Sequence, residues 1–212
     1  MTNPASTAVP QTALDLDAIL AKAWTDEGDF TAKEFERARA LYASMRAHDA
    51  RLLTLREAVA TEVAAWTGCT PRDVGSLGIR CNLEASDLDL GISYPVDRRD
   101  HLMQALAPHT RFLAERRTSY STTRLVFAFE REGVEVDLSA LTPEDFAVAT
   151  RMLDQIDSNM TETERVAYTW VKHLLRASGD LERYAAWKLV TYARFCPEFD
   201  WQPIPEKAKP TA

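Results

Sequence analysis

The chain has no long hydrophobic run and few cysteines. No stretch of about 18 consecutive apolar residues occurs, so no segment has the pattern of a membrane-spanning helix. The three cysteines, Cys69, Cys81 and Cys196, are odd in number and far apart, which argues against a disulfide framework or a zinc site. We therefore expect a cytoplasmic protein with no membrane partner.

Basic residues are in the minority. The chain contains 25 Lys and Arg against 32 Asp and Glu, and its formal net charge is −7. A protein that follows a long nucleic acid usually presents a basic surface, because it must neutralise phosphates. We therefore expect no long nucleic acid as a partner and favour a small acceptor, including a cationic one attracted to an acidic cleft.

Glycine is scarce, with seven residues in the chain. The Gly-Lys-Ser/Thr of a Walker loop is missing, and Gly75, Gly78 and Gly91 lack the spacing of a dinucleotide-binding fingerprint. The sequence does contain Gly75-Ser76, which offers close backbone approach, free N–H groups and a hydroxyl, as a triphosphate requires. Arg80 in the following turn can add a charged contact to phosphate.

Two acidic segments alternate with apolar residues and are predicted to be strands. In Asp87-Leu88-Asp89-Leu90 the two carboxylates project from one face, because successive side chains of a strand point to opposite sides. The segment 134–138 obeys the same alternation and places Asp137 on its polar face. Clustered carboxylates repel one another unless a hard cation such as Mg²⁺ lies between them. If the strands are neighbours, Asp137 joins the pair.

These residues carry a family resemblance over about residues 70 to 140. Gly75-Ser76 followed by Asp87-Leu88-Asp89-Leu90 resembles the Gly-Ser plus Asp-x-Asp signature of the DNA polymerase beta-like nucleotidyltransferase superfamily. The superfamily includes antibiotic-modifying and minimal nucleotidyltransferases. Many members have glycine where Arg80 stands here.

The resemblance implies a metal-dependent transferase that uses a nucleoside triphosphate such as ATP. Asp87 and Asp89 would hold two Mg²⁺ ions, with Mn²⁺ as an alternative. Asp137 would complete one metal site and help to activate an acceptor hydroxyl, while Ser76 would contact phosphate. The implied reaction moves a nucleoside monophosphate to a hydroxyl of a small molecule and releases pyrophosphate.

Other interpretations of the same motif stay open. Alternating acids also occur on the solvated face of an ordinary strand. A glycosyltransferase can hold Mn²⁺ with Asp-x-Asp, although it does not need the upstream Gly-Ser. A non-catalytic nucleotidyltransferase-like module could act through protein contacts, although such a module would normally have lost one of the three carboxylates.

Basic residues recur on one face of a predicted helix in the last third of the chain. They are Arg165, Lys172 and Arg176, and Lys188 follows in the next helix. A basic face there would suit a triphosphate, and Lys172 is the candidate phosphate-binding residue. The stronger interpretation is a solvated helix face, which is the usual place for lysine and arginine.

The predicted fold class is α+β, with a mixed β-sheet nucleotidyltransferase core flanked by helices and a C-terminal helical extension. Strands are expected at 124–130 and 134–138 around a turn at Gly133, and helix starts at Thr31, Thr142 and Thr161. A helix is also expected near 16–24 and another over 181–195, and the helical spacing over 35–66 predicts one long helix or two helices broken near His48-Asp49. Aromatic residues in the C-terminal helices leave a homodimer open. The predicted divisions are a disordered arm at 1–12, a core with N-terminal helices at 13–141, a helical extension at 142–200 and a tail at 201–212.

Overall fold

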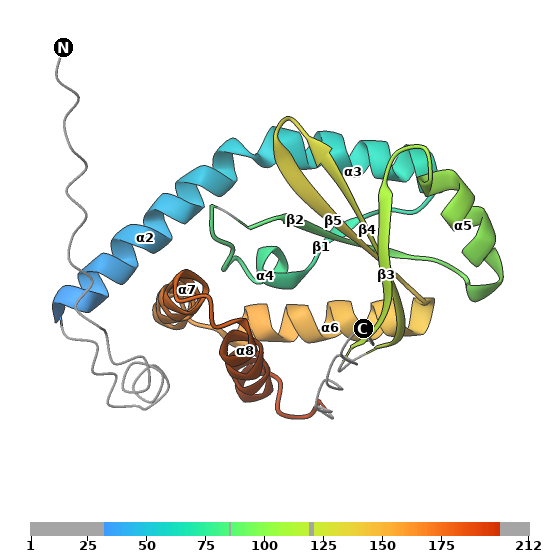
Figure 1. The fold of residues 1–212 in the computed structure, drawn as a ribbon. Coiled ribbons are helices and arrows are strands. Elements are labelled where there is room, and N and C mark those ends of the chain that lie inside the picture. The colour runs from blue at the N-terminus through green and yellow to red at the C-terminus, as the bar shows by residue number, and fades with distance from the viewer. Residues whose placement is uncertain (1–31, 85, 119–120, 200–212) are drawn as a thin grey trace, which may run out of the picture.

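A computed structural model describes residues 32–84, 86–118 and 121–199. These residues form one mixed sheet with helices on both faces (Figure 1), so the predicted α+β class is confirmed. The strand order is β1-β2-β5-β4-β3. The strands are β1 (Arg72–Asp73), β2 (Leu88–Ser93), β3 (Arg111–Thr118), β4 (Ser121–Arg131) and β5 (Val134–Leu141).

The centre of the sheet is a parallel pair, β2 and β5, and the remaining strand pairs are antiparallel. The hairpin of β4 and β5 confirms the prediction from alternating residues. Its turn has positive φ angles at both central residues, 53° at Glu132 and 77° at Gly133. Two consecutive positive φ angles are typical of a type I′ turn, whose twist matches that of the flanking strands.

One face of the sheet packs against α3 (Leu53–Thr67) and α5 (Arg99–Leu106), which follows the short 3₁₀ helix η1 (Val96–Arg98) (Figure 1). Every second residue of β2 and β5 enters this core, as the alternation requires. Its strand members include Leu88, Leu90, Val136 and Leu138. The residues between them, including the predicted site aspartates, therefore belong to the opposite face.

That opposite face is covered in part by α6 (Pro143–Asn159), beside which lie α7 (Glu162–Ala177) and α8 (Leu181–Phe195) (Figure 1). These three helices share a second apolar core with Ile79 and Cys81 from the loop that precedes β2. The long helix α2 (Ala32–Arg51) packs along α7. The last third of the chain therefore encloses the loop that leads to the acidic strand.

Helix starts follow the local sequence. Thr142 accepts a hydrogen bond from the Asp145 N–H, with Pro143 at the first helical position. Thr161 and Glu164 form a reciprocal capping box. Both predicted starts are confirmed, and the predicted helix over 181–195 matches α8.

Three local expectations differ from the structure. Strand β3 was not expected, because its segment combines charged residues with little alternation. Gly75-Ser76 does not form a simple turn but opens the one-turn helix α4 (Gly75–Gly78). The break between α2 and α3 falls at Leu52, slightly after the expected His48-Asp49.

Several predictions lie outside the described residues: the arm at 1–12, a helix near 16–24, the Thr31 cap and the tail at 201–212. The division of the chain near Leu141 stays a prediction. Within the described ranges, no helix is long and apolar enough to cross a membrane.

We expect Gly133→Ala to destabilise the protein by about 1–2 kcal/mol, because a side chain disfavours the left-handed backbone region. The φ angle there is +77°, and no atom lies within 4 Å of an added Cβ, so the cost is purely conformational. Glu132→Asn is the matched control, since Asn tolerates positive φ better than Glu. Urea unfolding that showed Gly133→Ala to be as stable as the wild type would contradict this account of the turn.

Candidate active site

The parallel pairing of β2 with β5 brings two of the predicted site residues side by side. Asp89 is the register partner of Asp137, and the neighbouring pair is Leu88 with Val136. Asp87 lies two residues before Asp89, directly ahead of the strand. Because β2 and β5 turn their apolar residues to the opposite core, Asp89 and Asp137 share the face next to α6, α7 and α8. The expected pairing of the two acidic segments is therefore confirmed.

Gly75 lies against the carboxylate of Asp89. The Val74 N–H donates to the Asp89 carbonyl over 2.9 Å, which fixes the start of α4 beside β2. Gly75 has a φ of +60°, and a Cβ at this position would lie 2.5 Å from Asp89 Oδ2. Only glycine fits both the backbone angle and this contact. Ser76 follows it, largely buried, in the first turn of α4.

Asp89 and Asp137 are like-charged neighbours on this face, and Asp87 also acts on Asp137. In the described part of the chain, their side chains make no hydrogen bond or ion pair. Burial raises the pKa of Asp89, and Asp137 raises it further. Burial also raises the pKa of Asp137, with Asp87 and Glu135 adding to the effect. The fold thus holds these carboxylates where their ionised forms are disfavoured.

Cationic side chains from α7 and α8 offset part of this repulsion. Lys188 opposes the rise in the pKa of Asp89, and Arg176 opposes that of Asp87, where burial is again the main cause. The sequence indicated Lys188 only weakly, because a lysine on a helix is usually solvated. Glu135, which the sequence offers as an acidic neighbour of Asp137, stands two residues before it and therefore on the same face.

Lys172 is buried, so the expected solvated face is wrong for this residue and for Arg165. Their exposed fractions are 1% and 3%. Lys172 Nζ donates to the Cys81 carbonyl at 3.3 Å and to Ser86 Oγ at 3.2 Å. Burial lowers the pKa of Lys172 to about 7, helped by Lys188. Lys172 therefore contacts both ends of the loop that leads to Asp87. Its contact with phosphate stays a prediction.

Ser86 was also missed by the sequence reasoning. Its hydroxyl accepts from the Leu83 N–H at 2.9 Å and from Lys172. Its position directly before Asp87 is the signal that could have found it. Ser86 fixes the backbone that leads to the first carboxylate.

Arg80 pairs with an aspartate of α6 that is not one of the three site aspartates. Its Nε and Nη2 atoms each donate to an oxygen of Asp157 on α6 at 3.0 Å. This bidentate pair holds the loop after α4 against α6. Binding of phosphate by Arg80 stays a prediction.

Two further side chains, those of Cys81 and Trp187, are part of the core shared by α6, α7 and α8. Burial raises the pKa of the Cys81 thiol to about 11, so it is a poor nucleophile. Trp187 is buried in the core shared by α6, α7 and α8. It therefore supports the packing of these helices.

The donor set fits Mg²⁺ in its chemistry. Carboxylate oxygens are the ligands that hard divalent cations prefer. Among the described residues, no three His, Cys, Asp or Glu side chains are already gathered around a common point. The register of Asp89 with Asp137 nevertheless brings two carboxylates to one face, where Asp137 raises the pKa of Asp89 beyond the effect of burial.

Among comparisons with known proteins, only the comparison with solved structures gives matches. No family model matches the chain, and no curated protein matches it. The GLD-2/RNP-8 complex matches at 16% identity with a TM-score of 0.44, covering 80% of this chain and 68% of that one. A cytoplasmic RNA terminal U-transferase matches at 15% identity with a TM-score of 0.36, covering 69% of this chain and 40% of that one.

The RNA terminal uridylyl transferase Cid1 matches at 16% identity with a TM-score of 0.30, covering 61% of this chain and 36% of that one. This chain thus spans less than half the length of the two U-transferase chains. Because each of these three TM-scores is below 0.5, the case for the site comes from the geometry of this chain.

We expect Gly75→Ala to damage the site and the comparable change Gly68→Ala to spare it. Both glycines have positive φ, so both substitutions carry a conformational cost of about 1–2 kcal/mol. Only the Cβ at position 75 collides with Asp89, since nothing lies within 4 Å of one at position 68. The measurement is the melting-temperature rise caused by Mg²⁺ with a triphosphate, which Gly75→Ala should lose. Equal rises in the two variants would contradict the role of Gly75.

Proposed function

We propose that this protein is a Mg²⁺-dependent nucleotidyltransferase that moves a nucleoside monophosphate from a nucleoside triphosphate to a hydroxyl of a small acceptor, releasing pyrophosphate. One observation carries the proposal. Asp89 lies in register with Asp137, and a Cβ at Gly75 would lie 2.5 Å from Asp89 Oδ2. The start of α4, which we propose to bind phosphate, therefore lies next to the carboxylate pair that we propose to bind the cation.

We assign three roles to the residues of this site: metal binding, proton transfer and phosphate binding. Asp87, Asp89 and Asp137 would hold the metal ions, and Asp137 would accept the proton from the acceptor hydroxyl. When bound, Mg²⁺ lowers the pKa of that hydroxyl and neutralises charge on the triphosphate. Gly75 and Ser76 supply backbone N–H groups and a hydroxyl for the phosphates. Lys188 and Arg176 add positive charge on the helix side.

The acidic surroundings favour a small cationic acceptor. Glu135 stands two residues before Asp137 on the same face, and its cross-strand partner is Glu130. Like charges placed opposite each other destabilise a sheet, so their presence favours an interaction with a cation. Arg111 reaches Glu135 only at 4.0 Å on an exposed surface, where such a pair is weak. These two glutamates would repel an RNA backbone that approached them.

The reaction is tested by pyrophosphate release. Purified protein is screened with each nucleoside triphosphate and Mg²⁺ against hydroxyl compounds with amino groups, and against a short RNA. We expect transfer to an amino-bearing acceptor and a loss of about 100-fold or more in rate for Asp137→Asn, because the proton acceptor is removed. Asp97→Asn, an exposed change on η1, is the matched control and should keep full activity.

Three outcomes would contradict the proposal in different ways. Full activity of Asp137→Asn would remove the catalytic role of that carboxylate. Transfer to RNA alone would overturn the small-acceptor assignment. Stabilisation by a nucleotide sugar with Mn²⁺, but not by a triphosphate with Mg²⁺, would favour a glycosyltransferase instead.

A further inference from the structure

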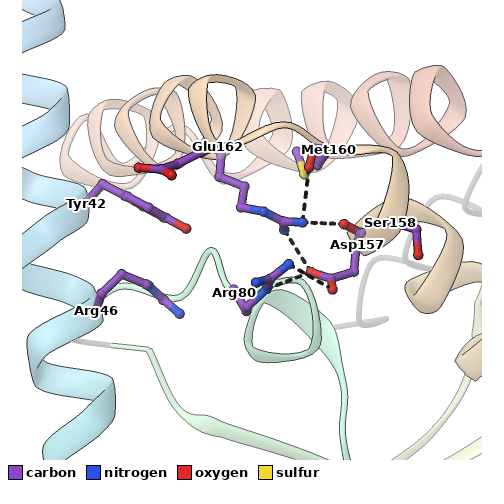
Figure 2. A pocket seen from close by; sticks show the side chains of 8 residues that line it. Tyr42, Arg46, Arg80, Asp157, Ser158, Met160 and Glu162 are labelled. Atoms are coloured by element: carbon purple, nitrogen blue, oxygen red, sulfur yellow. Dashed lines mark hydrogen bonds and ion pairs between the residues drawn. The ribbon is translucent and has the colours of Figure 1, made fainter.

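A cavity lies apart from the aspartates, between α2, the loop after α4 and the junction of α6 with α7 (Figure 2). Its volume is about 580 Å³, within the range of small-molecule sites. The charged and phenolic side chains that line it are Tyr42, Arg46, Arg80, Asp157, Glu162 and Arg165. None of the three site aspartates lines this cavity.

Arginine dominates the charge of this lining. Three guanidinium groups face two carboxylates, which leaves an excess of one positive charge in a protein of net charge −7. Guanidinium groups match the geometry of phosphate and carboxylate oxygens. The cavity therefore differs in charge from the chain as a whole and favours an anion.

Two of the three arginines are fixed in place before any ligand arrives. Asp157 accepts from Arg80 on one side and forms an ion pair with Arg165 at 2.8 Å on the other. Arg165 also donates to the carbonyls of Ile79 at 2.6 Å and Met160 at 3.2 Å. A binding site that is already ordered does not lose side-chain entropy when it closes on a ligand.

The remaining lining groups keep hydrogen-bonding capacity. Arg46 Nε has no partner among the described residues, although Asp49 and Asn82 accept from its terminal nitrogens. The hydroxyl of Tyr42 likewise has no partner within the described ranges, and Figure 2 shows its ring directed toward Arg80 and Asp157. A buried or half-buried donor without an acceptor carries a cost that a ligand oxygen would remove.

We propose that this cavity binds a small phosphorylated molecule, with the phosphate held by Arg46, Arg80 and the Tyr42 hydroxyl. The volume exceeds what inorganic phosphate fills, so the rest of the molecule occupies the space toward Glu162. The proposal does not depend on nucleotidyl transfer, because none of the three site aspartates takes part in it.

Binding is tested by isothermal titration calorimetry with the full chain, using inorganic phosphate and AMP as probes. EDTA is present throughout, so that metal-dependent binding at the aspartates is removed. We expect both probes to bind the wild type, and Arg46→Gln to weaken binding at least about tenfold through loss of a charge-assisted contact. Arg37→Gln, an exposed change on the same helix outside the cavity, makes the same change in charge and should bind as the wild type does.

Arg46 also pairs with Asp49 at 3.3 Å, so Arg46→Gln could weaken binding by disturbing the fold. A second variant separates these two causes. Tyr42→Phe removes only the hydroxyl and should also weaken binding, with an unchanged melting temperature in the absence of ligand. The proposal is overturned if neither probe binds the wild type. It is also overturned if Arg46→Gln and Tyr42→Phe both bind as tightly as Arg37→Gln, since any binding would then lie elsewhere.

Discussion

The parallel pairing of β2 with β5 is the constraint on which the candidate site depends. It places Asp89 directly beside Asp137 in the strand register. The hydrogen bond from the Val74 N–H to the Asp89 carbonyl places Gly75 next to the Asp89 carboxylate. Without a cation this arrangement costs stability, because burial and mutual repulsion raise the pKa values of these groups. The apolar side chains between the aspartates hold the strands in register despite that cost.

The helices after the sheet complete this arrangement. They share an apolar core with Ile79 and Cys81, and Lys172 holds the carbonyl of Cys81 and the hydroxyl of Ser86. The loop that connects α4 with Asp87 is thus positioned by α7. Arg165, in the first turn of the same helix, makes contacts that shape the cavity of Figure 2. Residues of α7 therefore contribute to both sites: Lys172 positions the loop before Asp87, and Arg165 lines the cavity.

Local patterns were sufficient to predict much of this fold. The alternation in 134–138, the turn at Gly133 and the caps at Thr142 and Thr161 depend on neighbours in the sequence, and all are confirmed. Strand β3 could not be predicted, because it is an edge strand whose pairing with β4 comes from tertiary contacts. The burial of Lys172 and the pairing of Arg80 with Asp157 also depend on contacts about 80 to 90 residues apart. The roles of the site residues stay predictions.

The most direct test of the central claim is the thermal stability of wild type and Asp89→Asn, measured with EDTA and with Mg²⁺ plus a non-hydrolysable triphosphate. The account predicts that the Asn variant melts higher in EDTA by about 2–4 °C, since one buried negative charge is gone. This difference should shrink at acidic pH, because the raised pKa of Asp89 lets the wild-type carboxyl become neutral as the pH falls through it. Mg²⁺ with the triphosphate should then stabilise the wild type alone. Equal stabilisation of both proteins, or a less stable Asn variant in EDTA, would contradict a repulsive carboxylate cluster built for a cation.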